Sequence, residues 1–440
     1  MNIVLLSGGS GKRLWPLSND MLSKQFLKLL EDENGKPETM VRRVARQLQA
    51  AHKNINLYVS CNDSQNDILQ RQLGEVETIK EPARRNTFPA IVLSAAYLRY
   101  EKELDDDAVF VACPIDVYAE SKYFELLTQV QELVAQNGKN IALMGALPTY
   151  PSEKYGYIKQ KNGEVTGFVE KPSADEAECL IAQGALWNCG VFGLKIGYVL
   201  ECARKYIAFD CYEDLYEQYD KLPENSFDYV VTENESSIGV VLYDGVWKDL
   251  GTWNTLTEET SSFVIGNALV ADNCQNTHVF NMLNIPVLVQ DIQDAVVIAS
   301  HDGVLVSSKQ GSSHLKPLAD QVSQRPMYEQ RRWGDYRVLD YKQAVGTSSL
   351  IKRLRIDAGQ GISYQYHLKR SEVWVIVRGK GIFTADGVDS VVGPGSVVQI
   401  PPKTKHSILA AVEMEIVEVQ LGVAELEEED IVRIPPEGQN

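Results

Sequence analysis

Short apolar runs alternate with longer amphipathic stretches from residue 3 to about residue 260. The apolar runs have the length of buried strands and include 3–6, 57–60, 108–112 and 141–144. The stretches between them place apolar residues at helical spacing and predict helices over 38–50, 64–73, 88–103 and 121–137. Strands that alternate with helices indicate an α/β fold with a mostly parallel sheet covered on both faces.

The pattern changes twice after this part of the chain. From residue 264 to about 320 it consists of short β-like runs separated by turn residues, with no convincing hexapeptide repeat. A polar stretch at 307–329 then leads into a segment that is all-β in character. Because 440 residues are too many for one compact core, we predict three domains, over residues 1–262, 263–325 and 326–440.

A glycine-rich turn with a basic tip follows the first predicted strand and reads Ser7-Gly8-Gly9-Ser10-Gly11-Lys12-Arg13. Glycines let backbone N–H groups approach an anion closely, so the turn suits a polyphosphate. A Walker A loop is excluded because Arg13 stands where that loop needs Ser or Thr. A dinucleotide fingerprint is excluded because Leu14 stands where its third glycine should be. The glycines alone leave an ordinary turn as an equally good interpretation.

The continuation of the turn is more specific, with Leu14-Trp15-Pro16-Leu17-Ser18 and then Ser23-Lys24-Gln25-Phe26-Leu27. The run resembles the N-terminus of sugar-nucleotide pyrophosphorylases, and most of all that of mannose-1-phosphate guanylyltransferases. Ser23 departs from the family, which usually has Pro there. The resemblance covers about 1–433. It implies a Rossmann-like nucleotidyltransferase domain with a mixed, mostly parallel sheet, a β-rich, β-helix-like linker, and a C-terminal cupin β-barrel resembling type II phosphomannose isomerase.

Such enzymes join two anions, so their sites must neutralise charge and align the reactants in line. Asp116 follows a predicted strand in Pro-Ile-Asp-Val, where the family commonly reads Pro-Ala-Asp-His, and Asp249 lies in a Trp-x-Asp-x-Gly-x-Trp motif. A lone Asp after a strand is more often a turn residue or helix cap. The resemblance instead implies that this pair holds Mg²⁺, with Arg13 and Lys24 completing the catalytic set.

The resemblance also implies the residues that contact GTP and mannose 1-phosphate. The nucleotide-binding residues would be Gly8, Gly9, Gly11, Arg85, Asn86 and Thr87. The sugar-phosphate-binding residues would be Gly156, Glu170, Lys171 and Asn188. Within this second set, Glu170 and Asn188 would bind hydroxyl groups and Lys171 the phosphate. Guanine and mannose themselves follow from the resemblance and from no spacing.

The third domain carries two cupin-like motifs. Five residues separate Gly361 from His367 and six separate Glu372 from Gly379, while a later motif ends at His406. By this likeness, a divalent metal such as Zn²⁺ would have four ligands, namely Gln365, His367, Glu372 and His406. Two family histidines are replaced by Lys369 and Val373, and a lysine beside a metal opposes it unless it points away. The sequence therefore leaves both the metal and an isomerase activity open.

Charge and cysteine content narrow the partners and the compartment. A net charge of −17 argues against nucleic acid, and it leaves local cations and a divalent metal to attract a nucleotide. Seven widely spaced cysteines without a C-x-x-C favour a reduced, cytoplasmic location. No apolar run approaches 18 residues, so we expect no membrane span. We expect a homo-oligomer, most simply a dimer.

Several alternatives to a mannose-1-phosphate guanylyltransferase stay open at this point. The chain would fit a nucleotidyltransferase for another sugar 1-phosphate or another base. It would also fit a bifunctional enzyme with mannose-6-phosphate isomerase activity in the cupin. A non-catalytic sugar-nucleotide sensor is a third alternative. The presence of Arg13, Lys24, Asp116 and Asp249 argues against a sensor, because a protein that only binds has no need of all four.

Overall fold

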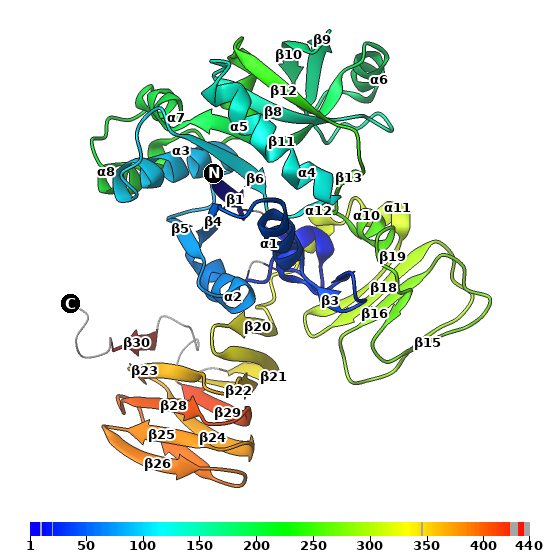
Figure 1. The fold of residues 1–440 in the computed structure, drawn as a ribbon. Helices are drawn as coiled ribbons and strands as arrows, with labels where there is room; N and C mark the ends of the chain where they lie inside the picture. The colour runs from blue at the N-terminus through cyan, green and yellow to red at the C-terminus, as the bar shows by residue number, and fades with distance from the viewer. Residues whose placement is uncertain (9–10, 20, 345, 423–429, 435–440) are drawn as a thin grey trace. The chain divides into compact units, whose positions relative to one another are not determined.

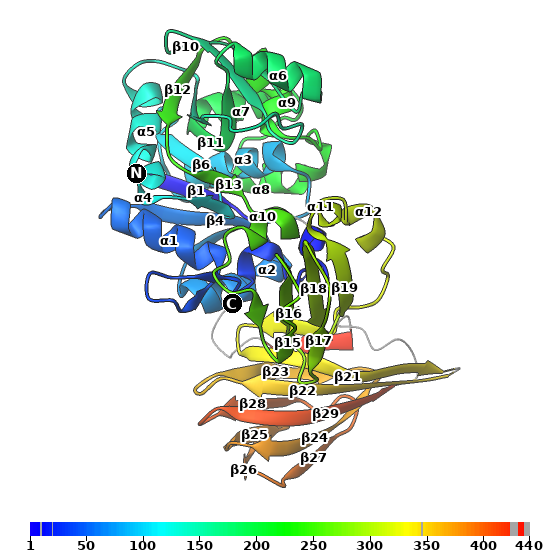
Figure 2. The same ribbon diagram turned by 90° about the vertical axis from the view of Figure 1, so that its right-hand side faces the viewer.

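The structure is a computed structural model that describes residues 1–8, 11–19, 21–344, 346–422 and 430–434 (Figures 1 and 2). The chain forms two compact units. The first unit comprises Met1–Leu14, Ser23–Ser262 and Lys309–His314. The second unit comprises Trp15–Leu22, Phe263–Ser308 and Leu315–Asn440. No helix among the described residues has the length and apolar character needed to cross a membrane.

A nine-stranded sheet forms the centre of the first unit (Figure 1). Its strands are β1 (Asn2–Leu6), β4 (Asn56–Asn62), β5 (Glu77–Glu81), β6 (Val109–Pro114), β8 (Ile141–Ala146), β9 (Tyr157–Lys161), β10 (Glu164–Val169), β11 (Leu186–Lys195) and β12 (Ile238–Tyr243). Strands β5, β4, β1 and β6 are parallel neighbours, and β12 is parallel to β8. Strand β11 runs antiparallel to β6, β8 and β9, so the sheet is mixed. This confirms the predicted α/β fold.

Helices pack on both faces of the sheet (Figure 2). The helices of the first unit are α1 (Met40–Ala51), α2 (Asp63–Leu73), α3 (Thr87–Ala96), α4 (Ser121–Glu125), α5 (Leu127–Ala135), α6 (Ala174–Ala182), α7 (Ile196–Arg204), α8 (Tyr212–Glu217), α9 (Phe227–Val230), α10 (Trp253–Thr257) and α11 (Lys309–Ser312). The predicted helix over 121–137 is divided at Leu126 into α4 and α5. Helix α3 continues as a π-helical turn, η3 (Tyr97–Glu101).

Local sequence explains where the principal helices begin and what they bury. Side chains of Thr39, Asn62 and Ser173 cap α1, α2 and α6 by accepting hydrogen bonds from backbone N–H groups of the first turn. Helix α3 is apolar on nearly every side, and its residues from Phe88 to Ala96 are all buried against the sheet and α7. A helix with no polar face is stable only inside a core, which places α3 at the centre of the unit.

Smaller elements of the first unit carry residues of the predicted site. They are η1 (Gly11–Leu14), η2 (Lys24–Phe26), β2 (Leu30–Glu31), β3 (Pro37–Glu38), β7 (Val117–Ala119), η4 (Tyr219–Lys221), η5 (Thr232–Asn234) and β13 (Trp247–Asp249). Gln25 attaches η2 to the end of β1, because its Nε2 donates to Ser7 Oγ at 3.0 Å. Ser23, which departs from the family's Pro, is fully buried and accepts a hydrogen bond from Gln65.

In the second unit, residues 263–308 form a small parallel β-helix. Its strands are β14 (Val264–Ile265), β15 (Ala268–Val270), β16 (His278–Asn281), β17 (Val287–Val289), β18 (Ala295–Ser300) and β19 (Gly303–Ser308). Each of the first three strands pairs in parallel with the second strand after it, β14 with β16, β15 with β17 and β16 with β18. The buried side chain of Asn281 donates to the backbone oxygens of Asn267 and Ile285 and thereby joins neighbouring coils. The predicted β-rich linker is thus confirmed.

The segment Trp15–Leu22, which follows the glycine-rich turn, packs on this β-helix within the second unit. Asn19 Nδ2 donates to Asp302 Oδ2 at 2.7 Å, and Ser300 Oγ donates to the backbone oxygen of Pro16 at 2.8 Å. The Trp15 ring lies where a side chain at Gly303 would otherwise stand. The run that follows the glycine-rich turn, on which the family resemblance rests, is therefore packed against the β-helix.

The rest of the second unit consists of a short helix, α12 (Lys316–Ala319), and two antiparallel sheets. The six-stranded sheet contains β20 (Tyr328–Arg331), β21 (Gly334–Ala344), β22 (Thr347–Ile356), β29 (Met414–Gly422), β24 (Ser371–Arg378) and β27 (Val397–Ile400). The five-stranded sheet contains β26 (Val388–Val392), β25 (Gly381–Ala385), β28 (His406–Ala410), β23 (Gly361–His367) and β30 (Ile431–Arg433). Both sheets contribute to one core, in which the Trp374 and Phe383 rings lie 5.7 Å apart. This is the architecture expected of a cupin.

Two leucines near the end of β8 test the core of the first unit. Leu143 is fully buried, whereas Leu147 is 54% exposed. We expect Leu143→Ala to lower the free energy of unfolding by about 2–5 kcal/mol, because it leaves a cavity in a packed core. Leu147→Ala is the matched control and should change it by less than about 0.5 kcal/mol. Urea unfolding of the full chain, followed by tryptophan fluorescence, measures both; equal losses would contradict the assigned register of β8.

Candidate functional site

Strand pairing brings the two predicted metal-binding aspartates together. Strands β1 and β6 are parallel neighbours, with Leu6 opposite Pro114, so Gly8 and Asp116 both follow the carboxyl ends of adjacent strands. Strand β7, directly after Asp116, pairs antiparallel with β13, and this pairing places Asp249 opposite Val117. Ligand sites of α/β sheets lie at this edge.

Lys24 lies between the two carboxylates. Its Nζ is 2.8 Å from Asp116 Oδ2 and 2.9 Å from Asp249 Oδ1. Burial opposes the charge on Lys24, but the two carboxylates outweigh it, and the pKa of Lys24 is raised. Burial likewise opposes ionisation of Asp249, whose pKa is nevertheless lowered by Lys24, Arg13 and Lys154. Lys154 was not predicted from the sequence and is a further cation of this group.

The donor set suits a hard divalent cation. A single ammonium group bridges one oxygen of each carboxylate, so the two oxygens are close enough to bind one ion in common. Mg²⁺ takes oxygen ligands and typically uses one or two carboxylates together with substrate phosphates. Asp116 and Asp249 therefore fit Mg²⁺, and Lys24 would have to leave them when it binds.

The nucleotide side of the predicted site contains one residue that the sequence analysis did not assign. Glu81 ends β5, and its Oε1 lies 3.9 Å from the position that a Cβ of Gly8 would take. It is 5% exposed and accepts hydrogen bonds from Ser60 Oγ at 2.8 Å and Tyr219 Oη at 3.0 Å. Burial raises its pKa. Gly11 begins η1, whereas Gly9 lies outside the described residues.

The predicted nucleotide segment Arg85-Asn86-Thr87 makes its described contacts with other parts of the protein. Asn86 has a left-handed φ of 74° and caps α3 through its Oδ1, which accepts from Thr87 N. Arg85 Nη2 donates to the backbone oxygen of Leu222 at 3.0 Å. Thr87 Oγ1 accepts from the backbone N–H of Phe227 at 2.9 Å. The segment is thus held at the start of α3 by residues 222–227.

Adjacent strands bring the four predicted sugar-site residues together. Strand β9 lies between β10 and β11, so Gly156, Glu170 and Asn188 come from neighbouring strands. Asn188 N donates to the Gly156 backbone oxygen at 2.8 Å, and Lys171 Nζ is 2.5 Å from Glu170 Oε1. A Cβ at Gly156 would lie 2.6 Å from Glu170 Oε2. The absence of a side chain at Gly156 therefore leaves room for that carboxylate in this position.

Asp228 is a member of this group that the sequence analysis missed. Its Oδ1 accepts a hydrogen bond from Asn188 Nδ2 at 2.9 Å. Burial, with a smaller contribution from Glu170, raises the pKa of Asp228 to about 7. The only sequence signal was an acidic residue after the helix-capping Ser226, and such a position is ordinary for a short helix.

An aromatic cluster connects the sugar-site residues with the carboxylate pair. Rings of Tyr155 and Trp187 are 5.1 Å apart, and those of Tyr155 and Trp247 are also 5.1 Å apart. Each ring is next in sequence, or nearly so, to a predicted site residue, namely Gly156, Asn188 and Asp249. Edge-to-face aromatic packing is rigid, so it holds the three site-bearing segments in one arrangement.

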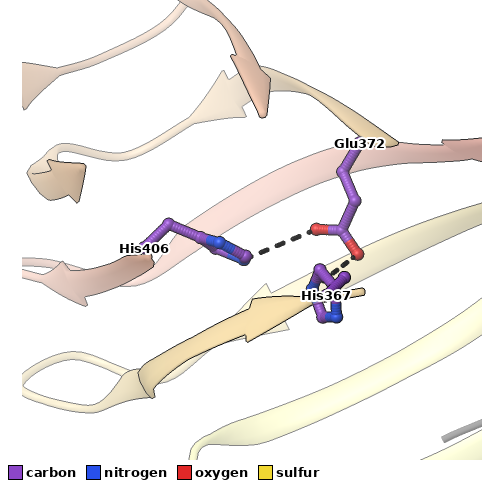
Figure 3. A group of neighbouring side chains, drawn as sticks. All are labelled: His367, Glu372 and His406. Carbon is purple, nitrogen blue, oxygen red and sulfur yellow. Dashed lines mark ion pairs between the residues drawn. The ribbon is translucent and has the colours of Figure 1, made fainter. Parts of the chain in front are cut away.

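In the cupin, His367, Glu372 and His406 converge from β23, β24 and β28 (Figure 3). All three are buried, and potential ligand atoms from them lie within 4.8 Å of one another. His367 Nε2 is 3.1 Å from Glu372 Oε1, and His406 Nε2 is 3.7 Å from Glu372 Oε2. The fourth predicted ligand, Gln365, is buried on β23 and is in register with His406.

The orientation of His406 favours a metal. Its Nδ1 lies 3.0 Å from the Thr404 backbone oxygen, which can only accept, so Nδ1 carries the proton. Burial lowers the pKa of His406, and in the neutral ring Nε2 then presents a lone pair toward the carboxylate of Glu372. Nε2 is buried without a hydrogen-bond partner in the part of the chain that the structure describes. A cation between the two groups would satisfy both.

The cation that opposes a metal here is Arg370, and Lys369 has no such role. Lys369 is exposed, whereas Arg370 is 4% exposed and donates from Nε to Glu372 Oε1 at 2.9 Å. Burial opposes ionisation of Glu372, but His367, Arg370 and His406 outweigh it and lower its pKa to about 2. Glu372 is therefore already neutralised in part by protein groups. The donor set fits a divalent metal, at a site with a competing guanidinium.

Two family models and several known proteins match this chain. A family model described as nucleotidyl transferase matches residues 2–264, and one described as the C-terminal part of mannose-6-phosphate isomerase matches residues 320–436. A mannose-1-phosphate guanylyltransferase of Escherichia coli K12 is 30% identical, with 98% of this chain and 97% of the relative covered. The xanthan biosynthesis protein XanB of Xanthomonas campestris pv. campestris B100 is also 30% identical, with the same coverage.

One solved structure is similar over most of the chain. It is described as a mannose-1-phosphate geranyltransferase from Thermus thermophilus and is 26% identical. The superposition covers 73% of this chain and 99% of the other, with a TM-score of 0.61. The covered 73% of the chain is longer than the first unit, so the similarity extends into the second unit.

The bridging position of Lys24 leads to a prediction about metal binding without substrate. Lys24→Met removes the cation that competes for Asp116 and Asp249, so we expect the free protein to bind Mn²⁺ about tenfold more tightly. Asp249→Asn should weaken the same binding. Electron paramagnetic resonance of free Mn²⁺ measures both, with the exposed Lys28→Met as matched control. Unchanged affinity in Lys24→Met would show that Lys24 does not compete with the metal.

Proposed function

The chain belongs to the nucleotidyl transferase family, and on that premise we propose that it is a mannose-1-phosphate guanylyltransferase. In this reaction a phosphate oxygen of mannose 1-phosphate attacks the α-phosphorus of GTP in line, which forms GDP-mannose and releases pyrophosphate. The observation that carries the proposal is the convergence of Lys24, Asp116 and Asp249 at the carboxyl ends of β1 and β6. The full-length similarity to enzymes of that name supports the choice of substrates.

The catalytic residues act through charge and alignment. Asp116 and Asp249 would hold Mg²⁺, which when bound supplies positive charge to the phosphates. Lys24, freed from the two carboxylates, and Arg13 would neutralise charge that develops on the α-phosphate and the leaving pyrophosphate. This local positive charge offsets a net charge of −17, which would otherwise repel both substrates.

The sugar phosphate would be held by the group around Gly156. Lys171 is suited to bind its phosphate, and Glu170 and Asn188 are suited to bind its hydroxyl groups. Lys171 and Glu170 form an ion pair at 2.5 Å, so the phosphate would take over the ammonium group while the carboxylate turned to hydroxyls. The pair is thereby poised to exchange partners when the substrate binds.

Glu81 supports guanine as the base. Guanine offers two adjacent donors, N1–H and the N2 amino group, and a carboxylate is the side chain that accepts from both. Glu81 presents a buried carboxylate beside Gly8, where the absence of a side chain leaves room for a ligand. Each of its oxygens accepts one hydrogen bond from the protein and keeps a further lone pair.

For the cupin we propose a divalent-metal site formed by Gln365, His367, Glu372 and His406, with Zn²⁺ as the expected ion. The lone pair that His406 Nε2 directs toward Glu372 supports it. A mannose-6-phosphate isomerase activity is the second candidate function, and the match of residues 320–436 to the C-terminal part of such isomerases favours it. Seven free cysteines fit the expected cytoplasmic location, and a homodimer remains part of the proposal.

Pyrophosphate release tests the main proposal. Each nucleoside triphosphate is paired with mannose 1-phosphate and with glucose 1-phosphate in the presence of Mg²⁺, and release confined to GTP with mannose 1-phosphate is expected. Asp249→Asn should lower kcat by about 100-fold or more, because it removes a charged metal ligand. Release with a different pair would support nucleotidyl transfer but would mean that the product is another sugar nucleotide. No release with any pair would favour a sugar-nucleotide sensor.

Metal analysis tests the cupin proposal. We expect the protein to retain about one equivalent of Zn²⁺ when Mg²⁺ is present in excess. His406→Ala should lose this Zn²⁺, since a four-ligand site that loses one ligand binds far more weakly. His314→Ala, at an exposed histidine, is the matched control. Guanylyltransferase turnover should be unchanged in both variants. Equal metal content in His406→Ala and the wild type would exclude this site.

A further inference from the structure

One short segment contacts each of the three residues, Glu170, Lys171 and Asn188, whose side chains we assign to the substrate. We call Leu222–Asn234, which contains α9 and η5, the brace segment. Asp228 Oδ1 accepts from Asn188 Nδ2 at 2.9 Å. Glu233 Oε1 accepts from the backbone N–H of Glu170 at 3.1 Å, and the Tyr229 ring centre lies 5.7 Å from Lys171 Nζ.

The same segment also holds the predicted nucleotide segment. Leu222 O accepts from Arg85 Nη2 at 3.0 Å, and Phe227 N donates to Thr87 Oγ1 at 2.9 Å. Asn225 O accepts from the backbone N–H of Phe88 at 3.2 Å. Both sets of contacts fall within thirteen consecutive residues of the first unit, from Leu222 to Asn234. The brace segment therefore connects the two halves of the proposed site.

Within the brace segment, Asp228 determines which way the Asn188 carboxamide faces. Asn188 Oδ1 accepts from the backbone N–H of Gly190 at 3.2 Å, while Nδ2 donates to Asp228. A reversed amide would set its NH₂ group against the Gly190 N–H and its oxygen against the carboxylate, which loses both bonds. Asn188 and Asp228 are 8% and 9% exposed, so water cannot easily replace these partners.

The backbone around Gly190 supports this arrangement. Gly190 has a φ of 71°, a left-handed conformation that glycine adopts without strain, and it lies in an irregularity of β11 between Asn188 and Phe192. The irregularity turns the Gly190 N–H toward the side chain two residues earlier. Asn188 thus keeps one N–H and one lone pair in a defined direction for a ligand.

We propose that the brace segment aligns the sugar and nucleotide subsites, and that Asp228 is a positioning residue that fixes the donor and acceptor ends of Asn188 for a sugar hydroxyl. The proposal rests on the proposed function, since it assigns Asn188 to the sugar. Asp228 acts through Asn188 and touches neither substrate. An amide whose orientation is already fixed binds a hydroxyl group without losing conformational entropy on binding.

Three variants test the role of Asp228. In Asp228→Leu, which lacks an acceptor, we expect the KM for mannose 1-phosphate to rise about tenfold, the effect of one buried hydrogen bond, and the KM for GTP to stay within about twofold. Asp228→Asn retains an oxygen that accepts from Asn188, so it should recover most of the loss. Asp220→Asn, at an exposed aspartate in η4, is the control.

Two kinetic results would overturn the role of Asp228. Equal increases of both KM values in Asp228→Leu would indicate general damage to the site, and equal behaviour of the Asn and Leu variants would show that the acceptor is unimportant. Calorimetry of mannose 1-phosphate binding to the same proteins distinguishes a failure of the positioning role from a failure of the proposed function. A wild type without turnover would contradict the function, whereas binding that is the same in wild type and Asp228→Leu would contradict the positioning role.

A double-mutant cycle tests the alignment of the two subsites. Thr87→Val removes the acceptor of Phe227 N on the nucleotide side, and Asp228→Leu removes the acceptor on the sugar side. If one segment holds both, the combined loss in kcat/KM should differ from the product of the single losses by about fivefold or more. A combined loss within about twofold of the product of the single losses would show that the subsites are held independently.

Discussion

Repulsion between two carboxylates governs the proposed catalytic centre. The pairing of β7 with β13 forces Asp249 close to Asp116, and two negative charges at that separation require a cation between them. Lys24 supplies it in the free protein, and its position depends in turn on Gln25, which attaches η2 to the end of β1. Strand pairing thus brings the two carboxylates together, and the placement of η2 supplies the cation that compensates them.

The same rule, that a buried charge or polar group needs a partner, organises the two other clusters. Among the predicted sugar-site residues, Asn188 is held between Asp228 and the Gly190 N–H, and Glu170 is paired with Lys171. In the cupin, Glu372 is compensated by Arg370 and two histidines. The clusters differ in one respect. Lys24 and Lys171 are terminal ammonium groups on long side chains that can exchange partners, whereas Arg370 is deeply buried beside its carboxylate.

The sequence left some side-chain directions open, because no local motif specifies them. Whether Lys369 faces a cupin metal was one of these; it is exposed, and the next residue, Arg370, is buried beside Glu372. The helix predicted over 121–137 forms as α4 and α5, which meet at Leu126. The β-helix showed no repeat because its strands are two to six residues long and its coils are unequal.

The sequence by itself determined the α/β order of the first unit, the β-rich linker, the cupin and the residues of the glycine-rich turn. Apolar periodicity and local motifs are properties of neighbouring residues, so they are readable without a structure. Only the tertiary structure decided that Lys24 bridges Asp116 and Asp249, that Glu81 lies beside Gly8, and that Asp228 accepts a hydrogen bond from Asn188. Those contacts join residues far apart in the chain, and their geometry is set by strand register and burial, which no local pattern encodes.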